Sequence, residues 1–134
     1  MTFEEAYQFC YSLNVGLDTK YTGLIEIHTE EQLAILDQIL GKIEIIDTPI
    51  NTMTFQFLQG VEGSYYYWLG ASDLYQEGQW SWINSKEPVG SFIWYSNEPG
   101  GGIESNCMLL DDSSHRAYDI PCSNGHYPLC QILI

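Results

Sequence analysis

Carboxylate side chains gather around a glycine-rich stretch in the second half of the chain. Glu98 and Glu104 lie on either side of the glycines at 100–102, and Asp119 follows further along the chain. Carboxylates attract cations, and a chain this acidic leaves cations open as partners. Residues 96–106 lack apolar periodicity, so we expect a loop, and such loops commonly carry binding residues. The pattern predicts a cation or ligand site here.

A second acidic pair precedes this loop. Asp73 and Glu77 stand four residues apart, immediately before Gly78. By themselves these residues indicate a turn that leads into the next strand.

The residues do not indicate catalysis. No Ser/His/Asp or Cys/His set is evident, because all four cysteines are expected in disulfides. Carboxylate pairs are expected by chance in a chain with 18 Asp and Glu residues, so their presence is weak evidence for glycosidase activity. We therefore predict that the protein is not an enzyme.

The charge of the chain excludes several classes of partner. The 134 residues include 18 Asp and Glu but only four Lys and Arg, which gives a formal net charge of −14. Such a surface repels nucleic acid and anionic lipid. No apolar run approaches the roughly 18 residues that a membrane span needs, so we expect no membrane insertion. Metal ions, a mineral surface or a basic protein remain as partners, with plain solubility as the alternative.

The cysteines indicate an oxidising compartment. Cys10, Cys107, Cys122 and Cys130 form no C-x-x-C motif, and an even count in a small chain predicts disulfides in a secreted or extracellular protein. Four cysteines allow three pairings. The short span from Cys107 to Cys122 favours a local bridge. Since no secretory leader precedes the first helix, we expect that one was removed or that this is a piece of a longer protein.

Capping signals predict two helices in the first third of the chain. Thr2 with Glu5 forms a capping box ahead of an amphipathic helix over residues 2–13, and Thr29 with Gln32 does the same for a second helix. Gly41 is expected to end the second helix.

One short strand is expected between the helices, at residues 24–27. The others follow the second helix, at residues 43–45, 52–58, 65–69, 79–83, 92–95, 108–110, 116–118 and 128–132, with a break at Pro49. Two helices followed by antiparallel strands indicate an α+β fold, and the length indicates a single domain over residues 1–134.

Several motifs in order give the chain a family resemblance. Trp68-Leu69-Gly70-Ala71 is followed by Glu77-Gly78-Gln79-Trp80-Ser81-Trp82, then by Trp94 and Glu98-Pro99, with the cysteines at matching places. The sequence resembles a C-type lectin-like domain over about residues 2–131.

The resemblance implies several structural features. It implies disulfides Cys10–Cys130 and Cys107–Cys122 and a cis Glu98–Pro99 peptide. It also implies that the family's first strand, which pairs with the last one, is missing. Residues 131–134 would then be an open edge or a place where another segment pairs. Residues 42–64 are longer than a minimal member needs and are expected to form an extra hairpin or loop.

The resemblance also implies a degenerate calcium and sugar site. The family's ligands are a Glu-Pro-Asn motif, a Glu before the third cysteine and an Asn-Asp pair. Here Gly100 replaces the first Asn, Ser105 replaces the Glu, and Tyr118 replaces the second Asn. The remaining candidate calcium ligands are Glu98, Asp119 and the neighbouring Glu104, with Asp73 and Glu77 at an accessory position. Gly100 and Tyr118 join them as candidate ligand contacts. Calcium is the implied cofactor, and so partial a ligand set predicts weak binding.

Three functional hypotheses follow. The first is an extracellular, non-catalytic recognition or structural module that binds a protein partner, or assembles as a homo-oligomer, with weak or no calcium dependence. The alternative is a calcium-dependent carbohydrate-binding lectin with a modified Glu-Pro-Gly site. A further alternative is an acidic matrix protein at a calcium mineral surface.

Overall fold

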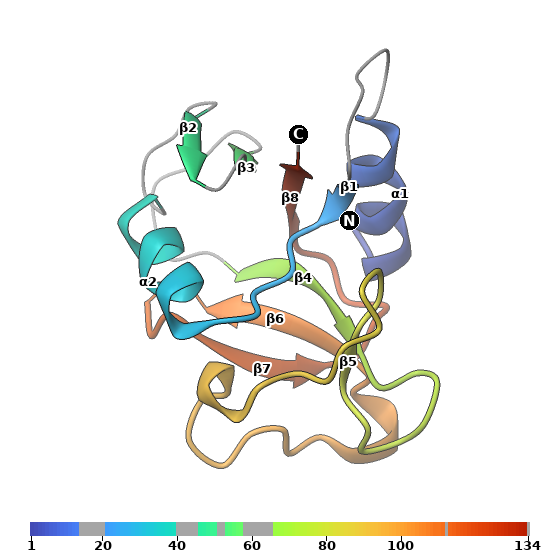
Figure 1. Ribbon diagram of the computed structural model, residues 1–134. Coiled ribbons are helices and arrows are strands. Elements are labelled where there is room, and N and C mark those ends of the chain that lie inside the picture. The colour runs from blue at the N-terminus through green and yellow to red at the C-terminus, as the bar shows by residue number, and fades with distance from the viewer. Residues whose placement is uncertain (14–20, 40–45, 51–52, 58–65, 112, 134) are drawn as a thin grey trace.

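The computed structural model describes residues 1–13, 21–39, 46–50, 53–57, 66–111 and 113–133. Two helices, α1 (Phe3–Ser12) and α2 (Glu30–Ile39), flank a mixed sheet (Figure 1). The strands are β1 (Tyr21–Leu24), β2 (Ile46–Ile50), β3 (Met53–Phe57), β4 (Tyr66–Ser72), β5 (Ser81–Trp82), β6 (Cys107–Asp111), β7 (Arg116–Ile120) and β8 (Tyr127–Leu133). Two 3₁₀ helices, η1 (Ser91–Ile93) and η2 (Gly102–Glu104), lie between β5 and β6.

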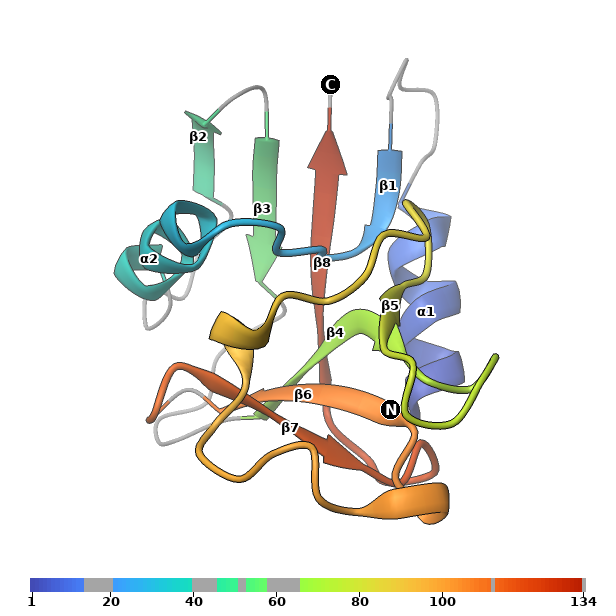
Figure 2. The same ribbon diagram turned by 60° about the horizontal axis from the view of Figure 1, so that its bottom comes forward.

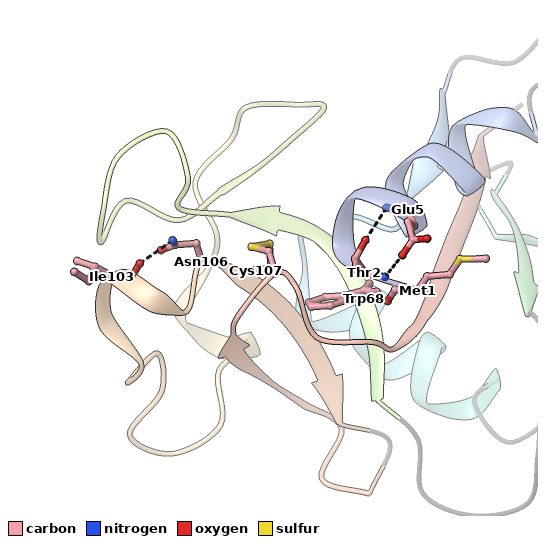
Figure 3. Close-up of a disulfide and its surroundings, with 8 residues drawn as sticks. Met1, Thr2, Glu5, Trp68, Ile103, Asn106 and Cys107 are labelled. Carbon is pink, nitrogen blue, oxygen red and sulfur yellow. Dashed lines mark hydrogen bonds between the residues drawn. A yellow bond between two sulfur atoms is a disulfide. The ribbon is translucent and has the colours of Figure 1, made fainter.

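The predicted capping box begins helix α1. The backbone N–H of Glu5 donates to the Thr2 hydroxyl at 3.2 Å, and the N–H of Thr2 donates to the Glu5 carboxylate at 2.9 Å (Figure 3). These two bonds satisfy N–H groups that have no partner inside the helix. Phe3, Ala6 and Cys10 then turn one buried face toward the sheet.

Helix α2 begins in the same way. The N–H of Gln32 donates to the Thr29 hydroxyl at 3.1 Å, and the Gln32 side chain accepts from the N–H of Thr29 at 3.2 Å. Leu33 and Leu36 are buried in the core below the helix. The predicted stop at Gly41 lies outside the described residues, as does the predicted strand at 43–45.

Strand β8 organises the sheet, whose order is β2-β3-β8-β4-β6-β7 with β1 also paired to β8 and β5 to β4. The first residues of β8, Tyr127 and Pro128, pair with β4 in parallel, whereas the other strand pairs are antiparallel. We expected antiparallel strands throughout. The sheet is mixed because β8 begins beside β4 and continues between β1 and β3 (Figure 2).

Strand β3 occupies the edge of β8 that the resemblance implied would be open. The register runs from Met53 opposite Leu133 to Phe57 opposite Leu129. Two alternatives were left open for this edge, and the structure has a paired segment there, which lies within residues 42–64. Pro49 was expected to break the chain, but it lies inside β2. Among the described strands β2 pairs only with β3, so a residue without an N–H group is tolerated there.

Two predicted strands are wrong in detail. Residues 24–27 were expected as a strand, but β1 ends at Leu24. Ile25 and Ile27 are buried in the core instead. Residues 92–95 were expected as a strand, but η1 takes their place, and only a single bridge joins Trp94 to Ala117.

The core and the disulfides fix this frame. Two clusters of buried side chains lie on the sheet, one containing Trp82 at 1% exposure and the other Trp68 at 0%. The disulfides Cys10–Cys130 and Cys107–Cys122 are both present, as the resemblance implied. Within the described residues no helix has the length and apolar character of a membrane span.

Candidate functional site

The candidate site lies where the long loop between β5 and β6 crosses strand β7. The loop is fixed at its start, since the N–H of Tyr95 donates to the carbonyl of Ala117 at 2.9 Å. The Glu98–Pro99 peptide is cis, as the resemblance implied, and Cys107 fixes the far end of the loop through its disulfide. Glu98, Gly100 and Asp119 are therefore brought together by this crossing.

Asp119 is the centre of the site. It lies on β7 with 8% of its surface exposed. The backbone N–H of Gly100 donates to its Oδ1 at 2.9 Å, and that of Gly101 donates to its Oδ2 at 2.8 Å. Hydrogen bonds from N–H groups to a carboxylate are among the stronger ones in proteins. The loop is therefore attached to the strand by its own amides.

Glu98 completes a carboxyl pair with Asp119. Its Oε2 also accepts from the N–H of Gly100, at 3.2 Å. Partial burial raises the pKa of Glu98, and the hydrogen bond and negative charge of Asp119 raise it further. Burial alone would raise the pKa of Asp119, but hydrogen bonds from Glu98, Gly100 and Gly101 outweigh it and lower that pKa. As pH falls, the pair therefore takes up its first proton on Glu98.

Gly101 has no room for a side chain. A Cβ atom there would overlap the side chain of Ser105 and lie 3.1 Å from Oδ2 of Asp119. Ser105 is 9% exposed, whereas Glu104 on η2 points to solvent. Among the described contacts, none joins Glu104 to Glu98 or Asp119, so the structure does not bring this candidate ligand to the pair.

Tyr118 takes part in an aromatic surface instead of the carboxyl pair. Its ring stacks on that of Tyr95, with centroids 4.9 Å apart and an interplanar angle of 21°. A hollow of about 400 Å³ lies beside it. The residues that line this hollow are Tyr66, Glu98, Leu109, Tyr118, Asp119, Ile120, Asn124 and His126. The hollow offers a ligand both aromatic faces and carboxylates.

The accessory pair is also brought together. Asp73 is 2% exposed, and its Oδ2 accepts from the N–H of Gly78 at 3.0 Å. Its Oδ1 is buried, and no hydrogen-bond donor among the described residues reaches it. Partial desolvation raises the pKa of Glu77, and the charges of Asp73 and then Asp119 raise it further. The negative charge of Glu77 is therefore disfavoured by both aspartates.

Asn106 is a neighbour of Asp73 that the sequence did not single out. The N–H of Asp73 donates to the backbone carbonyl of Asn106 at 3.3 Å. The Asn106 amide donates to the carbonyl of Ile103 at 3.0 Å (Figure 3), while its own Oδ1 is buried without a partner in the described part of the chain. Its place directly before Cys107 was the signal that could have found it.

The two positions fit a calcium ion differently. At the Glu98 position, both oxygens of Asp119 already accept loop N–H groups, and Gly100 and Tyr118 provide no amide oxygen. That donor set does not fit a full calcium shell. At the accessory position, Asp73 and Asn106 keep two buried acceptor oxygens without donors, beside the Glu77 carboxylate. No group of three or more His, Cys, Asp or Glu with metal-binding geometry occurs among the described residues.

A fold of two helices and a mixed sheet, with two disulfides and a long acidic loop, defines a lectin-like domain. The family described as "Lectin C-type domain" matches residues 1–132, and the chain belongs to this family. It is a non-catalytic family, which confirms the prediction that the chain is not an enzyme.

Relatives of known sequence cover only part of the chain. This chain is 28% identical over 96 residues to C-type lectin domain family 4 member M of Nomascus concolor. The aligned region covers 70% of this chain and 24% of the relative. The chain is 29% identical over 66 residues to a perlucin-like protein of Mytilus galloprovincialis, which covers 48% of this chain and 42% of the relative. The chain thus spans less than half the length of these relatives.

Solved structures share the fold. The C-type lectin CEL-I from Cucumaria echinata aligns with a TM-score of 0.73 at 16% identity, over 98% of this chain and 83% of that one. A calcium-independent type II antifreeze protein aligns with a TM-score of 0.66 at 22% identity, over 98% of this chain and 78% of that one. Similarity at this identity supports the fold alone.

Proposed function

We propose that this chain is an extracellular recognition module that binds a protein partner without a calcium ion at the Glu98 position. The observation that carries the proposal is the pair of N–H bonds from Gly100 and Gly101 to the Asp119 carboxylate. These bonds hold the loop on β7, so the loop needs no cation to keep its shape.

The partner is a protein with a basic surface. The net charge of −14 steers cationic partners toward the molecule. The hollow beside Tyr118 combines two carboxyl groups with exposed aromatic rings, of which Tyr66 is 45% exposed. Lys and Arg side chains bind both kinds of group, through charge and through cation–π contacts.

Carbohydrate binding through a modified Glu-Pro-Gly site has less support. In sugar-binding members of the family that this chain resembles, two sugar hydroxyls complete the coordination shell of a calcium ion. Gly100 and Tyr118 supply no amide oxygen to such an ion. Of the calcium ligands that the resemblance implies, only two, Glu98 and Asp119, accept from the same loop N–H group among the described contacts, that of Gly100. The mineral-surface hypothesis stays a prediction that rests on charge alone.

A structural calcium ion at the accessory position is the second candidate. The buried, donor-free oxygens of Asp73 and Asn106 favour it. An ion held there with Glu77 would fix the loop between β4 and β5. It would also offset the desolvation and the repulsion from Asp73 that together raise the pKa of Glu77.

Calorimetric titration of calcium into chelator-treated protein tests these proposals. We expect Glu98→Ala and wild type to release the same heat of calcium binding, because calcium does not bind at the Glu98 position. If wild type binds calcium at the accessory position, Asp73→Asn should abolish that heat. As a positive control, the triple variant Gly100→Asn, Ser105→Glu, Tyr118→Asn should gain heat that disappears on adding Glu98→Ala. A wild-type heat that Glu98→Ala removes, together with calcium-dependent retention on immobilised mannose, would support the lectin alternative instead.

A lysine-rich peptide tests the partner class directly. It should bind in the presence of chelator, and its affinity should fall as salt rises, because the attraction is electrostatic. Asp119→Asn should weaken that binding, whereas Glu31→Gln, at an exposed position on helix α2 outside the lining of the hollow, should matter less. Binding that appears only with calcium would contradict the proposal.

A further inference from the structure

A second and larger concavity lies apart from the candidate site. It has a volume of about 800 Å³ and shares no lining residue with the hollow beside Tyr118. One wall is the first turns of helix α1, with Phe3, Glu4 and Tyr7. The other wall comes from the end of β4, the following loop and the β5 hairpin, with Ser72, Leu74, Tyr75, Ser81, Trp82, Ile83 and Lys86. We call this the α1–β5 groove.

The rim of the α1–β5 groove carries two exposed apolar side chains. Tyr75 is 98% exposed, more than any other large hydrophobic residue that the structure describes, and the adjacent Leu74 is 59% exposed. Removing their apolar surface from water against a partner would favour association. Aromatic side chains in this situation are typical of interface anchors.

The loop that presents these two side chains is fixed at its base. Asp73, next to Leu74, is 2% exposed and accepts from the N–H of Gly78 at 3.0 Å. The N–H of Gln79 donates to the carbonyl of Gln76 at 2.9 Å, which closes the loop. A partner would therefore find Tyr75 already positioned, at little further cost in ordering.

The charges of the groove are nearly balanced, unlike those of the molecule. Lys86 on one wall and Arg116 elsewhere are the two Lys or Arg side chains in the described part of the chain. Glu4 lies on the opposite wall from Lys86. Two copies, each with a net charge of −14, repel one another over most of their surfaces, and this groove offers one of the two positive side chains among the described residues, Lys86.

We propose that the α1–β5 groove is the interface of a two-fold dimer of this chain. The groove contains both a recess and an exposed side chain, Tyr75, that can fill the recess of another copy. It also contains both members of a charge pair, Glu4 and Lys86. In a two-fold dimer, a residue i of one copy contacts residue j of the other, and residue j of the first copy contacts residue i of the second. Each side chain therefore meets its complementary group twice. Tyr75 of each copy enters the groove of the other against Tyr7, and Lys86 of each copy faces Glu4 of the other.

Such a dimer leaves both hollows beside Tyr118 uncovered. Two linked sites raise the effective affinity for a partner that presents repeated ligands. The dimer does not depend on the function proposed for the Glu98 position, since the two concavities share no residue.

Sedimentation velocity over about 1 µM to about 1 mM protein tests the dimer. We expect a reversible monomer–dimer transition that Tyr75→Ser weakens at least tenfold. Ile103→Ser is the matched control, because Ile103 is 77% exposed but lies on η2, outside the groove. A monomer at every concentration overturns the proposal, and so does an Ile103→Ser variant that is weakened as much as Tyr75→Ser.

Charge reversal provides a second test that does not rely on an aromatic residue. Lys86→Glu and Glu4→Lys should each abolish self-association, because each places like charges at both contacts. An equimolar mixture of the two variants should associate again as a heterodimer, because opposite charges then meet at both contacts. Failure of the mixture to associate, or persistence of either single-variant dimer, overturns the proposed arrangement.

Discussion

The backbone N–H of Gly101 donates to Oδ2 of Asp119 across a distance of 2.8 Å. Gly100 makes the matching bond to Oδ1 at 2.9 Å. A buried carboxylate on β7 thus satisfies two consecutive amides of the long loop. This relationship sets the shape of the loop, and it occupies the oxygens that the resemblance assigned to calcium.

Removal of the Asp119 carboxylate should loosen the long loop. Asp119→Ala leaves two N–H groups without their acceptor and is expected to cost about 2–3 kcal/mol of unfolding free energy. Urea denaturation checks this value. Glu104→Ala is the control, because Glu104 is exposed, and it should change the free energy by less than about 0.5 kcal/mol. Equal effects of the two substitutions would contradict the role given to Asp119.

Gly101 should not tolerate a side chain. Gly101→Ala places a Cβ atom against Ser105, so we expect destabilisation of about 1–3 kcal/mol from overpacking. Thermal denaturation of Gly101→Ala beside Gly125→Ala provides the comparison, since a Cβ at Gly125 meets nothing within 4 Å. Adding Ser105→Gly should recover part of the loss, and no recovery would mean that the clash lies elsewhere.

Stability should depend on pH through Glu98 and Asp119. The raised pKa of Glu98 means that the folded state holds its proton more tightly than the unfolded chain. Its contribution is therefore present at low pH and is lost as pH rises through the folded pKa. The pKa of Asp119 is lowered, so its contribution is present above the unfolded value and is lost as pH falls.

These opposite signs predict that the contribution of the pair is greatest in acidic solution between the unfolded pKa values of Asp and Glu, at about pH 4. In Glu98→Gln, a neutral side chain removes the repulsion, so the variant should be more stable than wild type at neutral pH and lose that advantage as pH falls. Urea midpoints measured across this pH range test the expectation. A Glu98→Gln variant less stable than wild type at neutral pH would show that the carboxyl pair is not under electrostatic strain.

The two disulfides should contribute unequally to the free energy of unfolding. Cys10–Cys130 spans 120 residues and Cys107–Cys122 spans 15. The chain-entropy model assigns roughly 4–5 kcal/mol to the long closure and roughly 3 kcal/mol to the short one. Denaturation of Cys10→Ala/Cys130→Ala and of Cys107→Ala/Cys122→Ala, each as a double variant, compares them. A larger loss for the short bridge would mean that local packing outweighs chain entropy.

Local sequence signals predicted the elements whose formation depends on residues close together in the chain. The pairs Thr2–Glu5 and Thr29–Gln32 located both helix starts, because capping is decided within four residues. The family motifs predicted both disulfides and the cis Glu98–Pro99 peptide.

Features that depend on distant pairing were harder to predict. Nothing near Met53 indicates that β3 pairs with β8, since the register is set by residues about 80 positions away. The hydrogen bonds of Gly100 and Gly101 to Asp119 also join distant segments. The sequence therefore identified Glu98, Gly100 and Asp119 as candidates but could not show that the amides and the carboxylate bind one another.

Hydrogen exchange at the Gly101 amide, followed by NMR with chelator and then with calcium, tests the central claim most directly. The bond to Asp119 predicts a slowly exchanging amide in chelator, with little change in rate or chemical shift when about 10 mM calcium is added. Asp119→Ala should make the same amide exchange quickly. A Gly101 amide that exchanges freely in chelator and becomes protected only with calcium would contradict the account.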